Sequence, residues 1–239
     1  MTLAENLQRV QQRIADACRA AGRNPEEVRL LPVAKTWPAE RVRELAGLGI
    51  TTVGENRVQE ARAKANELAD LGISWSIIGH LQTNKAKDVL AFADEVQSLD
   101  SLRLAAELHR RLAAADGLRG TGRPLRVYLQ VNTSAEDSKF GVTPAETLDV
   151  ARELAGFDRL HPVGLMTIAD PDPDRARECF RTLRTLRDAI AADPVASAAG
   201  DWAELSMGMS GDLEAAIAEG ATVVRIGRAI FGERPPHAG

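Results

Sequence analysis

Short runs of apolar residues alternate along the chain with longer stretches in which apolar residues recur at helical spacing. Residues 3–21 have the helical pattern and stop at Gly22, a residue that suits the end of a helix. Residues 28–34 then form a short apolar run, which is the pattern of a buried strand. Trp37 and Pro38 follow this run, and Pro38 can begin the next helix. The sequence therefore predicts an N-terminal helix and then a first strand followed by a helix.

The alternation continues to the end of the chain. The further strands that we expect are residues 51–54, 75–79, 95–99, 125–132, 162–168, 204–207 and 222–227. The clearest helices between them begin near residues 56, 84 and 101. Buried strands that alternate with helices in this way predict an α/β fold, a single (βα)8 TIM barrel with an extra N-terminal helix. A doubly wound open sheet fits the first half of the chain nearly as well.

The composition agrees with strands that are covered by helices. Of the 239 residues, 44% are hydrophobic but only 4% are aromatic, so the core must be built from aliphatic side chains. No linker or shift of composition divides the chain. We therefore expect residues 1–239 to form a single domain.

Charge and hydropathy argue against several classes of partner. The net charge is −4 with both signs interspersed, a pattern that offers no basic surface to nucleic acid. No segment approaches the roughly 18 consecutive apolar residues of a membrane span, and the acidic, amphipathic N-terminus differs from a signal peptide. Cys18 and Cys179 lie far apart with no histidine cluster nearby, which indicates neither a disulfide nor a metal site. We expect a cytoplasmic, monomeric protein without a metal ion.

Lys35 is the first candidate for chemistry, because the working residues of such barrels follow the C-terminal ends of the strands. It closes an apolar run, so its amine stands over a core where the neutral, nucleophilic form becomes accessible. Such an amine can form an imine with an aldehyde. The alternative is a lysine that extends from the strand end into solvent.

A run of small residues from Ser206 to Gly211 follows the seventh expected strand and precedes a helical pattern. Backbone N–H groups and serine hydroxyls at such a place can bind a phosphate, together with the loop after the eighth strand at Gly227 and Arg228. The alternative is a glycine-rich turn in which Ser210 only caps a helix. Arg225, near the end of the eighth strand, needs an acceptor if it is buried. A pyridine nitrogen or a carboxylate can fill that need.

A series of motifs extends in order from Lys35 to Gly232 and covers nearly the whole chain: KTWP, GENRVQE, GHLQTNK, VNTSAEDSKFG, GLMTI, LSMGMSGDLEAAI and VRIGRAIFG. In these motifs the chain resembles the YggS/PROSC family of pyridoxal-phosphate homeostasis proteins. The resemblance implies a barrel like the N-terminal domain of alanine racemase. It also implies that pyridoxal 5′-phosphate (PLP) is held as a Schiff base, an imine, on Lys35.

The resemblance further implies which residues surround the cofactor. The phosphate pocket of the family maps onto two loops of this chain, at Ser206, Met207, Gly208, Ser210, Gly227 and Arg228. Arg225 matches the arginine that faces the pyridine nitrogen, and Asn56 and Met166 match positions beside the ring. Arg228 stands where relatives often have a small residue or threonine, so only its backbone is expected to bind.

Two classes of function fit these residues. The first is a non-catalytic PLP carrier that buffers the aldehyde and delivers it to PLP-dependent apo-enzymes. The second is an amino acid racemase of the alanine racemase type, which takes a catalytic tyrosine from a second domain. The chain stops at Gly239 without residues for that domain, and its single tyrosine, Tyr128, falls within an expected strand. An arginine opposite the ring nitrogen also weakens the ring as an electron sink. We favour the carrier. A barrel aldolase with a substrate imine on Lys35 is a third reading, one that does not need Arg225.

Three other residues near the expected barrel mouth have open roles. His80 is either a base or, as we prefer, a side chain that hydrogen-bonds its own loop. Lys139 has two interpretations: it is a second amine that transiently receives PLP, or it has no such role. We favour the second interpretation. Glu55 is interpreted as an acid in the first turn of a helix, where it complements the helix dipole.

Overall fold

The structure, a computed structural model, describes residues 1–114, 124–136 and 138–233. Its eight strands form one parallel sheet in the order β1-β8-β7-β6-β5-β4-β3-β2. Their bounds are β1 Arg29–Pro32, β2 Thr52–Glu55, β3 Ser74–Ile77, β4 Glu95–Leu99, β5 Leu125–Gln130, β6 Leu160–Met166, β7 Glu204–Ser206 and β8 Val223–Ile226. A parallel bridge between Val33 and Gly54 joins the two ends of the sheet. The predicted (βα)8 barrel is therefore confirmed, and the open-sheet alternative is wrong.

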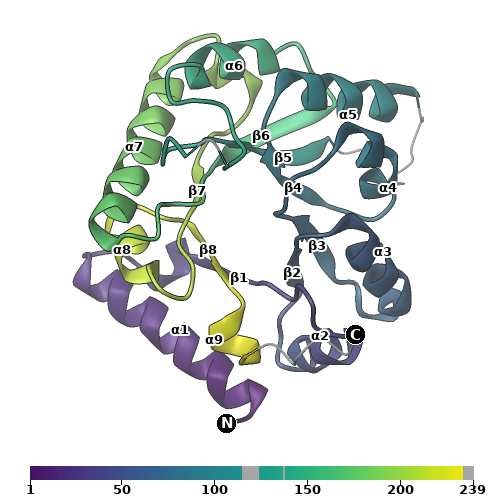
Figure 1. Ribbon diagram of the computed structural model, residues 1–239, viewed down its shortest axis with the longest axis vertical. Helices are drawn as coiled ribbons and strands as arrows, with labels where there is room; N and C mark the ends of the chain where they lie inside the picture. Colours follow the sequence, from purple (N-terminus) through teal and green to yellow (C-terminus); the bar gives the residue numbers. More distant parts are fainter. Residues whose placement is uncertain (115–123, 137, 234–239) are drawn as a thin grey trace.

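Helices surround the barrel on its outside, as Figure 1 shows. The α-helices are α1 Leu3–Ala20, α2 Ala39–Gly47, α3 Val58–Glu67, α4 Ala86–Leu90, α5 Leu102–Ala114, α6 Thr147–Leu154, α7 Pro173–Ala192, α8 Leu213–Ala218 and α9 Arg228–Phe231. Short 3-10 turns lie at η1 Pro25–Glu27, η2 Ala69–Leu71, η3 Thr83–Lys85 and η4 Ser197–Ala199. The extra N-terminal helix, α1, packs against α8 and α9.

The sequence pattern explains why α1 forms and where it packs. Its buried residues include Leu3, Leu7, Val10 and Ile14, whose spacing puts them on one face of a helix. Thr2 and the helix residue Glu5 cap each other's backbone amides at the N-terminus. The helix therefore has a defined start and one apolar face, which it buries against the barrel's last two helices.

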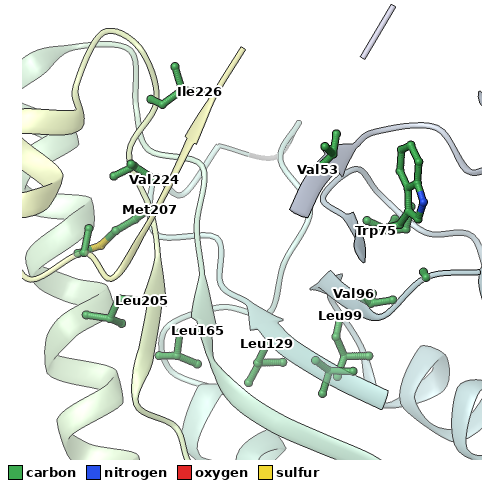
Figure 2. Close-up of a cluster of buried hydrophobic side chains, with 14 of the residues drawn as sticks. Val53, Trp75, Val96, Leu99, Leu129, Leu165, Leu205, Met207, Val224 and Ile226 are labelled. Atoms are coloured by element: carbon green, nitrogen blue, oxygen red, sulfur yellow. The ribbon is translucent and has the colours of Figure 1, made fainter. Parts of the chain in front are cut away.

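Two separate apolar clusters stabilise the barrel. The larger lies between the sheet and the helices, and Figure 2 shows part of it, including Leu129, Leu165 and Leu205. The smaller cluster consists of Leu31, Tyr128, Val163, Met166 and Val223. Because successive side chains of a strand point to opposite faces, the strands supply both clusters at once.

A polar cluster that the sequence pattern does not predict lies among the strand starts. Arg29 begins β1 and donates to Glu95 of β4 and to Tyr128 of β5, at 3.0 and 2.8 Å. Arg126 of β5 donates to Glu204 of β7 at 2.6 Å. These strands therefore meet at one end through ion pairs, which leaves the other end of the barrel for a site.

Among the described residues, no helix has the length and apolar character that crossing a bilayer requires. The same residues contain no group of three or more His, Cys, Asp or Glu side chains placed to hold a metal ion.

Gly164→Ala is expected to lower the free energy of unfolding. A β-carbon at this position of β6 would lie 1.8 Å from the carbonyl oxygen of Glu204 on β7. Forcing the two strands apart should destabilise the barrel by about 1–3 kcal/mol, measured by urea denaturation. Gly47→Ala in α2 is the control, because nothing lies within 4 Å of its new β-carbon. Equal stability of the two variants would contradict the tight β6 to β7 contact.

Candidate functional site

Lys35 lies where the barrel closes. The Val33 amide donates to the Ile226 carbonyl of β8 at 2.9 Å, and the Ala34 amide donates to the Gly54 carbonyl of β2 at 3.0 Å. The end of the first strand is thus held on both sides, and Lys35 follows directly at the C-terminal end of the barrel. Its side chain is half-buried. The position agrees with that of a lysine whose amine serves a site at the barrel mouth.

The chain turns sharply after Lys35. Thr36 has a φ of 68°, a left-handed conformation that is uncommon for a β-branched residue. Trp37 then stacks on Phe231 of α9, with 5.6 Å between the ring centroids. This stacking ties the loop after β1 to the helix that follows β8, so the two segments form adjoining walls of the mouth.

Glu55 has a different role from the one expected. It is the last residue of β2 rather than an acid in the first turn of a helix, because α3 begins only at Val58. The side chain is fully buried, and its Oε1 accepts from Lys64 Nζ at 2.5 Å. Burial raises the pKa of Glu55, although Lys64 opposes this shift. Lys64 also donates to the Ala34 carbonyl at 2.8 Å, so the pair fixes the backbone just before the candidate lysine.

Arg225 is buried inside the barrel, with 4% of its surface exposed. Its Nη1 donates to the carbonyl oxygen and the hydroxyl of Ser206, at 2.7 and 2.9 Å. Its Nη2 donates to the Thr167 carbonyl at 2.7 Å. Burial lowers the pKa of Arg225 to about 10, which still leaves the guanidinium charged at neutral pH. Among the described residues no carboxylate pairs with it, so the barrel mouth holds a cation that can take a further acceptor.

Ser206 lies deeper than a surface phosphate loop would place it. The hydroxyl is fully buried and donates to Gln97 Oε1 at 2.6 Å while it accepts from Arg225. Its single proton is therefore already engaged. In this geometry the Ser206 side chain supports Arg225, and its expected bond to phosphate stays a prediction.

Met207 also departs from the expected pocket. Its side chain lies in the outer apolar cluster beside Leu205 and Val224, as Figure 2 shows. Its amide donates to the Val223 carbonyl at 3.1 Å. Neither group of Met207 is directed to a ligand in this structure, because strand alternation turns the residue after Ser206 to the opposite face.

The remaining residues of the expected pocket lie together in two loops. Gly208 has a φ of 93°, and a β-carbon there would lie 2.6 Å from the Ala216 β-carbon, so only glycine lets this loop approach α8. The Ser210 hydroxyl accepts from the Ala229 amide of α9 at 3.4 Å, which joins this loop to the one at Gly227. Among the described residues, the amides of Gly208, Ser210 and Gly227 donate no hydrogen bond to the protein. They are donors that an anion can use.

Two details limit how that anion can be held. The Met209 amide already donates to the Asp212 carboxylate at 2.5 Å. Arg228 has an exposed side chain, which agrees with a role for its backbone alone. The loops therefore offer an anion backbone amides rather than a second charged side chain.

Asn56 and Met166 lie at the C-terminal ends of β2 and β6. Asn56 directly follows β2, and its Oδ1 is buried without a hydrogen-bond partner in the described part of the chain. Met166 is fully buried in the small apolar cluster with Leu31 and Tyr128. An unsatisfied buried oxygen is unfavourable unless something binds it, so Asn56 is a second group that fits a bound molecule.

His80 hydrogen-bonds a neighbouring loop and not its own, so the expected partner is wrong. Its Nδ1 lies 2.8 Å from Asp100 Oδ2, and its ring stacks on Phe140 at 3.6 Å between centroids. The partner is the loop after β4 rather than its own loop. The histidine links three loops of the barrel mouth.

Lys139 is engaged as well. Its Nζ lies 2.6 Å from Glu136 Oε1 and donates to the Ala169 carbonyl at 2.9 Å. These bonds join the loops after β5 and β6. The arrangement gives Lys139 a structural role, and a role as a second amine for PLP would require both bonds to break.

The chemistry of the mouth follows from these contacts. A half-buried amine can form a covalent bond to a carbonyl, a buried cation can face an uncharged acceptor, and free amides can bind an anion. A molecule that carries an aldehyde, a ring nitrogen and a phosphate has one group for each. PLP has these three groups, so the residues present fit it.

The chain is similar to known proteins over nearly its whole length. Residues 3–235 match the family described as "Alanine racemase, N-terminal domain". The pyridoxal phosphate homeostasis protein of Pseudomonas aeruginosa is 43% identical over 235 residues, which cover 98% of this chain and 96% of that protein.

Solved structures agree with these sequence matches. The structure of PipY from Synechococcus elongatus PCC7942, with PLP bound, has a TM-score of 0.80 and 32% identity, and the match covers 97% of this chain and 100% of that one. An alanine racemase from Corynebacterium glutamicum has a TM-score of 0.61 at 17% identity, over 99% of this chain and 62% of that one. The second likeness shows a common fold alone.

Proposed function

The chain belongs to the pyridoxal phosphate homeostasis proteins, within the family of the alanine racemase N-terminal domain, and from this premise we propose that it holds PLP on Lys35. Its role is PLP homeostasis in the cell, through buffering of the cofactor or delivery to apo-enzymes. The observation that carries the proposal is the pairing of β1 with β8, which brings half-buried Lys35 and buried Arg225 to the same end of the barrel. PipY, a relative whose structure holds PLP, supports the choice of cofactor.

Bound PLP supplies an aldehyde, a pyridine nitrogen and a phosphate, and three parts of the chain act on them. The Lys35 amine would hold the aldehyde carbon covalently, as a Schiff base. The Arg225 guanidinium would donate to the ring nitrogen. The amides of Gly208, Ser210 and Gly227, together with the Ser210 hydroxyl, would bind the phosphate, and Asn56 and Met166 would line the ring.

The same residues support a carrier rather than an enzyme. Arg225 is a cation inside the barrel, and a cation beside the ring nitrogen disfavours its protonation. The single tyrosine of the sequence, Tyr128, is fully buried and accepts from Arg29 among the strand starts. Burial raises the pKa of this phenol, so it stays protonated at neutral pH and is not available as a base. A racemase needs an acid and a base on opposite faces of the substrate carbon, and this tyrosine serves neither face.

An imine on a lysine can be hydrolysed back to the amine and the aldehyde, so Lys35 would both store and release the cofactor.

We further propose that the protein acts as a monomer in the cytoplasm and that the chain is one domain. Support for the last point comes from the sheet, since all eight strands belong to it. The recipients of PLP are PLP-dependent apo-enzymes.

Lys35→Ala is expected to abolish the violet-absorbing imine and the adduct trapped by borohydride. The fold should persist, because Lys35 follows β1 and is only half-buried. Lys87→Ala is the matched control, since Lys87 is exposed on α4. Peptide mapping after reduction of the wild-type protein should place the label on Lys35. A label mainly on Lys139 or Lys85 would overturn the assignment.

Ser210→Ala is expected to weaken PLP more than pyridoxal, which has no phosphate. The Ser210 hydroxyl oxygen accepts from the Ala229 amide, so its proton is the group that the substitution takes from the phosphate. Loss of this hydrogen bond to a charged group should reduce PLP affinity by about 1.5–3 kcal/mol, roughly tenfold to a hundredfold. Ser197→Ala is the control, because Ser197 lies in η4 before β7, at the other end of the barrel. Equal losses for PLP and pyridoxal would show that this loop does not bind phosphate. Titration of the apoprotein with each compound measures both affinities.

The wild-type holoprotein is expected to exchange the Cα hydrogen of L-alanine with deuterated water at a negligible rate. The reason is that the buried cation of Arg225 keeps the ring nitrogen unprotonated, while Tyr128 is directed to the strand starts. Proton NMR measures the exchange, and chiral chromatography detects D-alanine. Turnover at about 1 s⁻¹ or faster, the low end for ordinary enzymes, would restore the racemase alternative.

A further inference from the structure

A chain of hydrogen bonds extends through the barrel from the polar cluster at the strand starts to Arg225. Gln97 Nε2 donates to Glu95 Oε1 at 2.7 Å, and Ser206 Oγ donates to Gln97 Oε1 at 2.6 Å. Arg225 Nη1 then donates to Ser206 Oγ at 2.9 Å. Every donor in the chain points toward Glu95, an arrangement in which successive bonds polarise one another.

Glu95 fixes the direction of this chain. It is buried and accepts from Arg29 at 3.0 Å and from Ser76 Oγ at 2.8 Å. Burial alone would favour the neutral acid, but Arg29, Gln97 and Ser76 outweigh it, and the pKa of Glu95 is lowered. The carboxylate is thus ionised at neutral pH and can only accept hydrogen bonds.

The orientation of Gln97 follows from an acceptor-only Glu95. Gln97 is fully buried on β4, and its NH₂ group must face the carboxylate. Its carbonyl oxygen then faces Ser206 and requires the hydroxyl proton. The Ser206 oxygen is left with its lone pairs toward Arg225. One side chain, Gln97, therefore determines which way the serine hydroxyl points.

This arrangement determines which N–H groups of Arg225 remain available to a ligand. Both Nη1 hydrogens are engaged by Ser206, and one Nη2 hydrogen is engaged by the Thr167 carbonyl. The second Nη2 hydrogen and the Nε hydrogen have no acceptor in the described part of the chain. The guanidinium is held by one edge and can present the other edge to a bound ring.

We propose that Gln97 is a positioning residue for the cofactor: by orienting the Ser206 hydroxyl toward itself, it fixes Arg225 so that the free edge of the guanidinium meets the ring nitrogen of PLP. The inference rests on the proposed function. It adds a residue without cofactor contact to the machinery, since Gln97 acts only through Ser206 and Arg225. It also gives the buried, ionised Glu95 a task, because the carboxylate sets the direction of the whole chain.

The test compares two ligands that differ only at the ring nitrogen. The apoprotein is titrated with PLP and with 1-deaza-PLP, in which carbon replaces that nitrogen. The wild-type protein should prefer PLP, and Gln97→Met should reduce this preference about tenfold, the loss expected for one hydrogen bond to a charged group. Gln130→Met is the control. Gln130 is also buried, on β5, but it donates to the Phe140 carbonyl and takes no part in the hydrogen bonds between Glu95 and Arg225.

A spectroscopic readout separates positioning from general damage to the fold. The ¹⁵N shift of ring-labelled PLP should report an unprotonated nitrogen bonded to a cation in wild type and in Gln130→Met. In Gln97→Met the shift should move toward that of the nitrogen in free PLP at the same pH. If Gln97→Met does not fold, Ser206→Ala breaks the same chain while the backbone carbonyl that accepts from Arg225 remains.

The outcomes distinguish the inference from its premise. Wild-type protein that binds neither ligand contradicts the proposed function and, with it, the inference. Variants that bind PLP on Lys35 but keep the wild-type ligand preference and ¹⁵N shift overturn the role of Gln97 alone. A reduced preference and a shifted resonance, both absent from Gln130→Met, support it.

Discussion

The rest of the structure depends on the burial of a permanent cation, Arg225, inside the barrel. A charge in this place is strongly unfavourable unless neighbouring groups accept its hydrogen bonds. The protein provides two carbonyls and one hydroxyl but, among the described residues, no carboxylate in contact. The nearest negative charge along the hydrogen-bond chain is Glu95, two side chains away. The guanidinium consequently has N–H groups left for a further acceptor, which suits a ligand with a ring nitrogen.

The outward face of the strands contributes to stability, and the inward face contributes to the binding site. Outward-facing side chains such as Leu165 and Leu205 form the apolar layer under the helices. Inward-facing side chains include the polar chain from Glu95 to Arg225, which no apolar layer interrupts. Lys35 stands where the barrel closes, between β8 and β2, and Lys64 secures the backbone just before it. A shift of strand register would therefore disturb the core and the site together.

Much of the fold and of the candidate site could be predicted from the sequence. The spacing of apolar residues indicates the strands and helices, and the ends of the strands indicate where a site lies. The apolar runs gave the barrel, and its strand ends led to Lys35, Arg225 and the glycine loop. The motifs gave the family. Pairing between distant side chains could not be read in the same way. Ser206 and Met207 are neighbours in one short segment, yet strand alternation sends one inward to Gln97 and the other into the outer core. Glu55 was misread because β2 extends one residue further than its apolar pattern.

A crystal structure of the protein with PLP tests the central claim most directly. The account predicts continuous density from Lys35 Nζ to the former aldehyde carbon, with the ring nitrogen within about 3 Å of a guanidinium nitrogen of Arg225. The phosphate should lie between the loops at Gly208 and Gly227. PLP bound to another lysine, or a ring turned with its nitrogen away from Arg225, would contradict the account.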